Sequence, residues 1–183
     1  MSLRIIAGTF KGRLLKAPKG PSTRPTQGML REAVFNICQN DIGNARFLDL
    51  YAGSGAMGLE ALSRGAAHAT LVEQNRHAIA CIKENIAALH LESQAALIPF
   101  DANRALTLLT KQGALFDILY VDPPYDSPVP LEPLVPLLAP HATLFIEERY
   151  NPKKPHQPPT HASLHHKETR RFGIALLSIF RAF

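Results

Sequence analysis

Cysteine is scarce in this sequence, and long apolar runs are absent from it. The two cysteines, Cys38 and Cys81, have no partner at a metal-ligand spacing, so we expect free thiols and no bound metal. No stretch approaches the roughly 20 apolar residues that cross a bilayer. Residues 1–13 are basic but lack the apolar core of a signal peptide. The composition therefore predicts a reduced, cytoplasmic protein that is not bound to a membrane.

Acidic residues are absent from positions 1–31, which carry seven Lys or Arg. Residues 149–183 carry seven more against a single acid, whereas residues 32–148 hold six basic residues and fourteen acids. Basic flanks around an acidic centre indicate that the flanks bind a polyanion while the centre has another task. A solvated surface explains the composition equally well, so the separation of the charges is the informative part.

The chain is long enough for one domain with a small appendage. Its 183 residues are 46% hydrophobic, which suffices for one ordinary core. We expect residues 41–183 to form that domain and residues 1–40 to form a basic extension of hairpin, loop and helix. The hairpin is predicted from two short strand-like segments, 4–7 and 13–15, joined through glycines. We expect a monomer.

From Arg46 onward, expected strands and helices alternate. The expected strands are 47–50, 70–73, 96–99, 117–121 and 142–146, followed by a closing strand pair that includes 171–183. The expected helices are 29–38, 56–63, 76–89, 104–110 and 131–138. Apolar strands that alternate with helices predict a Rossmann-like α/β fold, a mostly parallel sheet with helices on both faces.

Four of the expected strands end at or near an acid: Asp49, Glu73, Asp101 and Asp122. Ligands of such sheets bind at the carboxyl ends of the strands. We therefore expect the four carboxyl groups along one edge of the sheet. Turns alone poorly explain why four strands end at or near an acid.

Residues Gly53 to Gly58 match the pattern G-x-G-x-x-G between a strand and a helix, and Glu73 lies twenty residues beyond Gly53. The loop predicts a ligand close to the backbone at a helix N-terminus, and Glu73 predicts a ribose. A nicotinamide dinucleotide fits this pattern, so a small NAD(P)-dependent oxidoreductase is one interpretation. Ser54 is not in the Gly-x-Ser-x-Gly arrangement of a nucleophile.

Asp49 favours a different ligand. A carboxylate four residues before Gly53 would repel a pyrophosphate but attract the ammonium or sulfonium of S-adenosylmethionine. The alternative is a carboxylate that is bonded to loop amides. Asp101 and Ala102 are placed to meet an adenine amine, although a helix N-cap explains Asp101 equally well.

Residues Asp122-Pro-Pro-Tyr125 follow the fourth expected strand. Proline fixes φ and has no amide hydrogen, so the Pro123 carbonyl and Asp122 can together accept the hydrogens of a planar exocyclic amine. Tyr125 can stack on the ring that carries this amine. The two acceptors expose the lone pair of the nitrogen to a methyl sulfonium, and transfer is then mainly a matter of positioning. A paired base must leave its stack to reach such a site.

The motifs occur in an order that resembles the RsmD-type methyltransferases, which methylate the guanine N2 amine of small-subunit (16S) ribosomal RNA. The segments that carry the resemblance are 4–8 (RIIAG), 11–13 (KGR), 23–26 (TRPT), 31–36 (REAVFN), 48–55 (LDLYAGSG), 58–65 (GLEALSRG) and 122–125 (DPPY). The resemblance implies a class I methyltransferase fold, S-adenosylmethionine as cofactor, and a small ribosomal subunit or its assembly intermediate as partner. The sequence departs from the family at Gly28 and Met29, where charged residues are usual.

The motifs and the resemblance together predict three sets of site residues. The target amine would meet Asp122, Pro123, Pro124 and Tyr125. The cofactor would meet Asp49, Tyr51, Gly53, Ser54, Gly55, Glu73, Gln74, Asp101 and Ala102. The RNA would meet Arg4, Lys11, Arg13, Arg24, Thr26 and Arg31, because phosphate contacts need exposed cations.

Three other functions stay open. The oxidoreductase leaves Asp122-Pro-Pro-Tyr125 unexplained, and a ribosome-binding module without catalysis would not need it. An N6-adenine methyltransferase shares the tetrapeptide, but such enzymes usually carry a separate target-recognition region, for which 183 residues leave little room.

Overall fold

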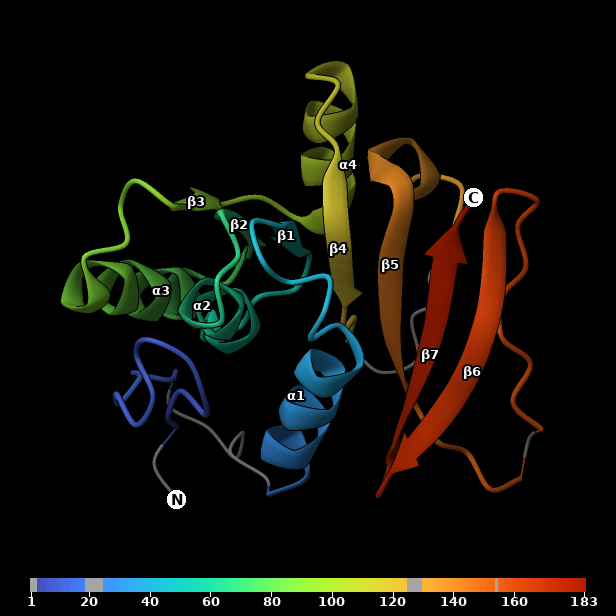
Figure 1. Ribbon diagram of the computed structural model, residues 1–183, viewed down its shortest axis with the longest axis horizontal. Coiled ribbons are helices and arrows are strands. Elements are labelled where there is room, and N and C mark those ends of the chain that lie inside the picture. Colours follow the sequence, from blue (N-terminus) through green and yellow to red (C-terminus); the bar gives the residue numbers. More distant parts are fainter. Residues whose placement is uncertain (1–2, 19–24, 125–129, 154) are drawn as a thin grey trace.

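Seven strands form one mixed sheet that runs through the molecule (Figure 1). The computed structural model describes residues 3–18, 25–124, 130–153 and 155–183, and for residues 25–27 it describes the backbone alone. The strands are β1 (Arg46–Asp49), β2 (His68–Val72), β3 (Ala95–Ile98), β4 (Phe116–Val121), β5 (Leu138–Arg149), β6 (Leu164–Phe172) and β7 (Ala175–Ala182). Their order in the sheet is β3-β2-β1-β4-β5-β7-β6.

The strands from β3 to β5 pair in parallel. β7 pairs antiparallel with β5 and with β6, which confirms the expected closing pair. The predicted α/β fold with a mostly parallel sheet is therefore confirmed. Because β1 to β5 run the same way, their carboxyl ends meet at one edge, where ligands of this fold bind.

The α-helices of the described residues are α1 (Pro25–Ile37), α2 (Ala56–Ser63), α3 (Arg76–Leu89) and α4 (Ala102–Lys111). The bounds expected for α2 and α3 agree with the structure. α3 begins after Asn75, whose side-chain oxygen accepts hydrogen bonds from the amides of His77 and Ala78. This is the usual N-cap arrangement, and it fixes the start of the helix.

The helix expected at residues 131–138 is wrong. The structure has a three-residue 3-10 helix there, η1 (Val135–Leu137), and β5 follows it directly. Pro133 and Pro136 have no amide hydrogen, so this segment cannot make the continuous hydrogen bonds of an α-helix. The apolar spacing that suggested a helix reflects leucines that are buried in the core.

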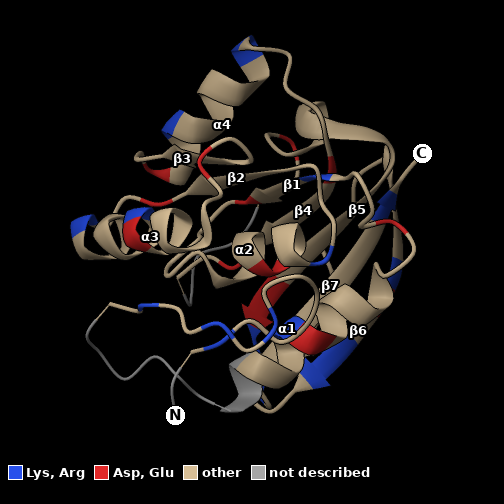
Figure 2. Ribbon diagram, turned by 60° about the vertical axis from the view of Figure 1, so that its left-hand side comes forward, with Lys and Arg blue, Asp and Glu red and all other residues tan. Residues whose placement is uncertain are grey.

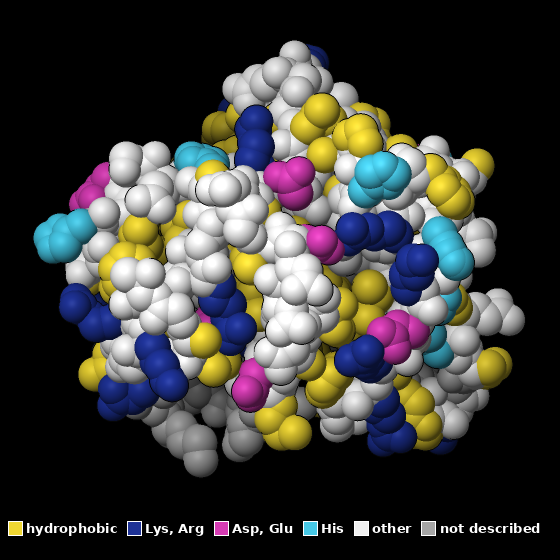
Figure 3. All heavy atoms as spheres, viewed as in Figure 1, with side chains coloured by type: hydrophobic (Ala, Val, Ile, Leu, Met, Phe, Trp, Pro, Cys, Tyr) yellow, Lys and Arg dark blue, Asp and Glu magenta, His cyan; other side chains and the backbone are white. Residues whose placement is uncertain are grey.

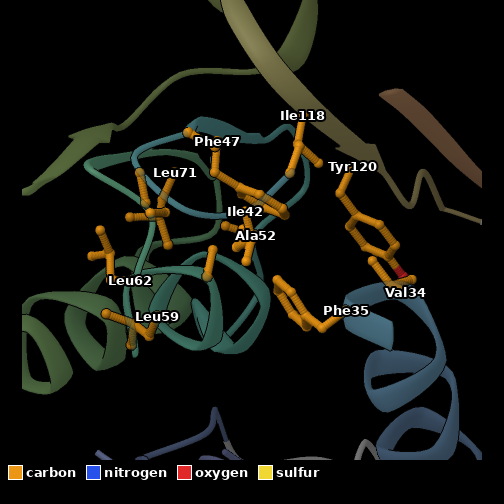
Figure 4. Close-up of a cluster of buried hydrophobic side chains, with 14 of the residues drawn as sticks. Val34, Phe35, Ile42, Phe47, Ala52, Leu59, Leu62, Leu71, Ile118 and Tyr120 are labelled. Carbon is orange, nitrogen blue, oxygen red and sulfur yellow. The ribbon is translucent and has the colours of Figure 1, made fainter. Parts of the chain in front are cut away.

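Successive residues of the central strands pack into two hydrophobic clusters, one on each face of the sheet. Phe47 and Ile118 pack with the helices α1, α2 and α3 (Figure 4), whereas Leu48 and Leu119 pack with α4 and η1. The rings of Phe35 in α1 and Phe47 stack with their centroids 5.8 Å apart. Helices therefore cover both faces, as predicted. No helix among the described residues has the length and apolar character needed to cross a membrane.

The N-terminal segment, residues 3–18, is attached to α2 by a buried glutamate. The amides of Ile6 and Ala7 donate to the two carboxylate oxygens of Glu60 at 2.7 and 2.9 Å. The segment folds back on itself through a single antiparallel bridge between Arg4 and Leu14, so the expected hairpin is confirmed in a short form. These hydrogen bonds add to the packing of Ile5 and Leu15, which are buried in the core cluster, and of Leu3 and Phe10 against it.

Gly8 tests how closely this segment must approach α2. Its φ is +80°, and a Cβ atom there would lie 1.8 Å from the carbonyl oxygen of Ser63. We expect Gly8→Ala to lower the free energy of unfolding by about 2–4 kcal/mol, as measured by urea denaturation. Gly12→Ala is the matched control, because its φ is +83° but nothing lies within 4 Å; it should cost only about 1 kcal/mol. Equal losses would contradict the close contact.

Candidate functional site

A cavity of about 330 Å³ opens at the carboxyl edge of the sheet. The ends of β1, β2 and β4 contribute to it, and so does the connection from β3 to α4. The lining residues are Leu50, Tyr51, Val72, Glu73, Gln74, Phe100, Asp101, Ala102, Asp122, Pro123 and Pro124. The volume lies at the lower end of the range for small-molecule sites in proteins.

The structure brings most of the predicted site residues together in this cavity. Those in its lining are Tyr51, Glu73, Gln74, Asp101, Ala102, Asp122, Pro123 and Pro124. Asp49, at the end of β1, and Gly53, Ser54 and Gly55, in the adjoining loop, are not in the lining. Tyr125 is outside the described residues. The prediction missed Leu50, Val72 and Phe100, although each directly precedes a predicted residue.

The glycine loop owes its shape to two different constraints. Gly53 and Gly55 have φ of +55° and +79°, which side chains rarely adopt. A Cβ on Gly55 or Gly58 would also lie 3.1 or 3.0 Å from Leu71 in β2, whereas Gly53 has open space around it. Gly55 and Gly58 therefore allow α2 to pack closely on the sheet, and Gly53 leaves room beside the cavity.

Glu73 fastens this loop to the end of β2. Its carboxylate accepts hydrogen bonds from the amides of Gly53 at 2.7 Å, Gln74 at 2.9 Å and Asn75 at 2.8 Å. A carboxylate offers about four lone-pair sites, so one is left for a further donor. The position and this remaining capacity fit a ribose hydroxyl.

Asp49 is a buried carboxyl group with an unsatisfied oxygen. The side chain is 1% exposed, and Oδ2 accepts a hydrogen bond from the Gly58 amide at 3.2 Å. Oδ1 has no hydrogen-bond partner among the described residues. Burial, and next to it the charge of Glu73, raise the pKa of Asp49 to about 7. Oδ2 is thus bonded to a backbone amide, as the alternative interpretation of Asp49 expected. Oδ1, without a partner in the described part of the chain, can meet a cationic ligand.

Asp101 lies at the start of α4 and at the wall of the cavity. It is the N-cap of α4, since Oδ1 accepts a hydrogen bond from the Arg104 amide at 3.0 Å, and it also lines the cavity. Next to it, the guanidinium carbon of Arg104 lies 3.7 Å from the centre of the Phe100 ring. The ring is thus held in place at the wall of the cavity.

Asp122 lies beside a second carboxyl group that the sequence did not reveal. Val121 pairs with Ile146 in the parallel register, so Asp122 and Glu147 follow at neighbouring positions. Burial first, and then the charges of Glu147 and Asp49, raise the pKa of Asp122 to about 8. Glu147 is 8% exposed, and its Oε2 accepts a 2.5 Å hydrogen bond from the Tyr120 hydroxyl.

Alternation along the strands places these groups on one face of the sheet. Phe47, Tyr120 and Phe145 pack in the same cluster. Asp49, Asp122 and Glu147 each come two residues after one of these three, in that order. Side chains two apart point to the same face. Strand register was the signal that could have identified Glu147, but it is not available before the pairing of β4 with β5 is known.

Known proteins match the chain over nearly its whole length. The family described as "Conserved hypothetical protein 95" matches residues 3–181. The Escherichia coli (strain K12) protein "Ribosomal RNA small subunit methyltransferase D" is 36% identical over 172 residues, which cover 91% of this chain and 84% of that protein. The chain belongs to this RsmD family. The relative of the same name from Haemophilus influenzae is 30% identical over 79% of this chain and 78% of its own length.

Solved structures agree with this assignment. The Escherichia coli protein yhhF has a TM-score of 0.84 at 32% identity, covering 100% of this chain and 98% of that chain. A hypothetical protein of Thermus thermophilus has a TM-score of 0.79 at 30% identity, with coverages of 97% and 98%. A SAM-dependent methyltransferase of Agrobacterium tumefaciens, 19% identical with a TM-score of 0.63, covers 87% of this chain and 63% of that chain. It shares the fold, and the expected class I methyltransferase fold is confirmed.

In this RsmD-family chain, Asn85 of α3 links the N-terminal segment to the glycine loop. It is 2% exposed; its Oδ1 accepts from the Lys16 amide, and its Nδ2 donates to the carbonyls of Lys16 and Ser54. Both the oxygen and the nitrogen of the side-chain amide are therefore hydrogen-bonded, and they join two segments that are far apart in the sequence. Nothing in the sequence pattern indicated this role.

The predicted RNA-binding residues fall into three groups. Arg4, Lys11 and Arg13 are exposed on the N-terminal segment, where Figure 2 shows Lys and Arg positions. Arg24 lies outside the described residues, and the side chain of Thr26 is not described. The exposed three stay candidates for phosphate contacts.

The expectation of an exposed side chain at Arg31 is wrong. Arg31 is only 7% exposed; its Nη2 donates to the carbonyl of Arg4 at 2.6 Å, and its Nε lies 3.6 Å from a carboxylate oxygen of Glu60. The side chain joins α1 to α2 and to the N-terminal segment, so it does not reach a phosphate at the surface. Arg31 is therefore not part of the exposed basic surface of the N-terminal segment.

Asp49 should make the protein without ligand less stable as the pH rises. Its pKa is about 7 in the folded state against an ordinary 3.8, so between about pH 4 and pH 7 only the folded state retains the proton, and the free energy of unfolding falls. Asp49→Asn keeps an acceptor for Gly58 and should be about 2–4 kcal/mol more stable than wild type at pH 8 in urea denaturation.

Asp101→Asn is the control for this measurement. It removes an exposed carboxylate from the same edge of the sheet but keeps an N-cap residue. The pH dependence of stability should then match wild type. An Asp49→Asn variant that loses stability with pH as steeply as wild type would show that Asp49 is ionised in the free protein.

Proposed function

We propose that this protein is an S-adenosylmethionine-dependent methyltransferase that methylates the N2 amine of a guanine in small-subunit (16S) ribosomal RNA. The observation that carries the proposal is that the turn Asp122-Pro123-Pro124 lines the same cavity as Glu73 and Asp101. The residues expected to hold the donor and those expected to hold the amine thus share one space. The family relatives named for small-subunit ribosomal RNA support the RNA substrate.

The residues around the cavity fit S-adenosylmethionine at three points. Glu73 has remaining acceptor capacity for the ribose hydroxyls, and Phe100 with Asp101 forms a wall for the adenine. Asp49 carries a buried oxygen without a partner among the described residues, which suits a cationic ligand. The donor, when bound, supplies an electrophilic methyl group on a sulfonium.

Asp122 and the Pro123 carbonyl would hold the target amine. Both groups accept hydrogen bonds, and neither proline has an amide hydrogen that would compete for them. An aryl amine is a weak nucleophile because its lone pair is delocalised, and acceptors on its hydrogens oppose that delocalisation. The stacking role of Tyr125 stays a prediction.

Asp122 and Glu147 also provide a place for the proton that the methylated amine must lose. A buried carboxyl group, Glu147, and a half-buried one, Asp122, at neighbouring positions of two strands cannot easily both be ionised. A proton accepted by Asp122 can therefore be shared with Glu147, which Tyr120 holds in position. The two carboxyl groups thus act as a general base of modest strength. Most of the rate enhancement comes from positioning of the amine against the methyl group.

We further infer that the protein is cytoplasmic and monomeric, with residues 1–40 as an RNA-binding extension of the methyltransferase domain at 41–183. The exposed Arg4, Lys11 and Arg13 support the RNA-binding extension. The relatives' names support a substrate in the small ribosomal subunit.

Labelled methyl transfer to small ribosomal subunits tests the function directly. Subunits from a strain that lacks this gene should accept methyl groups from S-adenosylmethionine, and the modified nucleoside should be N2-methylguanosine. A product methylated on adenine N6 would assign the chain to the other base amine. Stabilisation by NADH but not by S-adenosylhomocysteine in a thermal-shift assay would instead support the oxidoreductase.

Asp122→Ala should keep the affinity for S-adenosylhomocysteine and lose methyl transfer by about 100-fold or more, because the amine loses an acceptor. The control is Asp117→Ala on the same strand, since Asp117 is exposed and bonds to the amide of Arg46 instead. Its kcat should stay near wild type. Full activity in Asp122→Ala would refute the mechanism.

Glu147→Gln should shift the pH dependence of methyl transfer to lower pH. Removing the charge of Glu147 lowers the pKa of Asp122, so Asp122 ionises at lower pH. The midpoint of the acid limb of kcat against pH measures this shift. Glu148→Gln, one residue further along β5 and on the other face of the sheet, should leave the midpoint unchanged. A midpoint that moves equally in both variants would rule out specific coupling.

A further inference from the structure

A stacked pair of side chains, Tyr150 and Arg171, lies at the same edge of the sheet as the cavity. Tyr150 directly follows β5, and Arg171 is near the end of β6, which leads into the turn to β7. The guanidinium carbon of Arg171 lies 3.7 Å from the centre of the Tyr150 ring. No motif in the sequence assigned a role to either residue.

Strand register places the strand that leads to Tyr150 beside the strand that ends at Asp122. Val121 is opposite Ile146 in the parallel pairing of β4 and β5, so the residues after Asp122 leave the sheet beside those that lead to Tyr150. Neighbouring strands lie about 5 Å apart. Tyr150 therefore follows the strand next to β4, three residues beyond the level of Asp122, and Arg171 reaches it from β6, from which β5 is separated by β7.

Two contacts of Arg171, and one hydrogen bond of the neighbouring turn, hold its side chain in advance of any ligand. Besides its stacking on Tyr150, its Nε donates to the carbonyl of Gly173 at 2.9 Å. Gly173 has φ of +61°, and the turn that contains it is tied to β5 by a 2.8 Å hydrogen bond from the Tyr150 amide to the Ile174 carbonyl. A guanidinium held in this way loses little side-chain entropy when it binds.

The end of this guanidinium differs from those of three other exposed arginines, Arg4, Arg13 and Arg170. Each of these three donates from a terminal nitrogen to a protein oxygen. Arg171 is exposed, and among the described residues its hydrogen bond comes from Nε alone. Two parallel N–H groups at its end are the geometry that binds a phosphate through both of its oxygens.

The charge of the surroundings also favours a phosphate. The cavity is lined by the acidic residues Glu73, Asp101 and Asp122, and carboxylates repel a polyanion if no cation lies nearby. Figure 3 shows Lys and Arg side chains gathered over β6 and β7, on the right-hand side of the view. The exposed basic residues of β6 are Lys167, Arg170 and Arg171.

We propose that Arg171, supported by Tyr150, binds a backbone phosphate of the RNA strand next to the methylated nucleotide. This inference rests on the proposed function for its RNA substrate. The contact adds salt-dependent affinity and fixes the strand at the entrance to the cavity without reading its sequence.

Arg171→Gln tests the contact, and Arg46→Gln is the matched control. Arg46 is also exposed and lies over an aromatic ring, that of Phe116, at 5.6 Å. It begins β1, however, and is thus at the opposite edge of the sheet. The binding probe is small-subunit ribosomal RNA transcribed in vitro, titrated at several salt concentrations, with S-adenosylhomocysteine affinity measured in parallel.

We expect Arg171→Gln to weaken RNA binding about tenfold near 0.1 M salt and to reduce the slope of log K against log salt by about 0.7–0.9. KM for the RNA should rise while kcat and the affinity for S-adenosylhomocysteine stay near wild type. Arg171→Lys should keep the slope but lose part of the affinity, because lysine lacks the planar fork. Arg46→Gln should behave as wild type.

Equal RNA affinity and slope in wild type, Arg171→Gln and Arg46→Gln would overturn the inference, even if wild type methylates the RNA. Loss of affinity without a change of slope would also overturn it, since a phosphate contact releases counterions. Absence of methyl transfer in wild type is a separate result that refutes the proposed function. A specific loss of RNA affinity in Arg171→Gln would still support the phosphate contact in that case.

Discussion

The parallel register of the central strands places three carboxyl groups, the buried Asp49 and Glu147 and the half-buried Asp122, at one edge and on one face of the sheet. Burial disfavours their ionised forms and raises the pKa of Asp49 to about 7 and of Asp122 to about 8. Such an arrangement reduces the stability of the empty protein near neutral pH. It becomes favourable when a cation and a hydrogen-bond donor enter, which are what a sulfonium ligand and an amine substrate provide.

The rest of the fold holds this edge in place through a few buried polar side chains. Glu60 binds the N-terminal segment and approaches Arg31, and Asn85 joins that segment to the glycine loop at Ser54. Glu73 closes the loop from the other side. The segment that carries the exposed cations Arg4, Lys11 and Arg13 is thereby connected, by direct hydrogen bonds, to the loop beside the cavity. The proposed substrate and cofactor sites thus share one rigid frame.

Much of this could be predicted because local patterns determined it. The helices at 56–63 and 76–89, the parallel sheet and the acids at the strand ends follow from apolar periodicity and loop residues. Glu147 could not be predicted, since its importance depends on the register of two strands. Arg31 was taken for a surface cation because its burial depends on Glu60, a tertiary contact. The helix expected at 131–138 is wrong because its prolines prevent the hydrogen bonding that its leucines suggested.

Proton release on donor binding tests the central claim that buried, partly protonated carboxyl groups receive a cationic ligand. Calorimetric titration of S-adenosylmethionine at pH 7, in buffers with different ionisation enthalpies, counts the protons exchanged. Binding of the sulfonium should ionise Asp49 and Asp122 and release close to one proton or more, whereas the uncharged sulfur of S-adenosylhomocysteine should release fewer. Equal proton exchange for both ligands would contradict a role of these carboxyl groups toward the sulfonium, and no exchange with either ligand would contradict their role in receiving a cation.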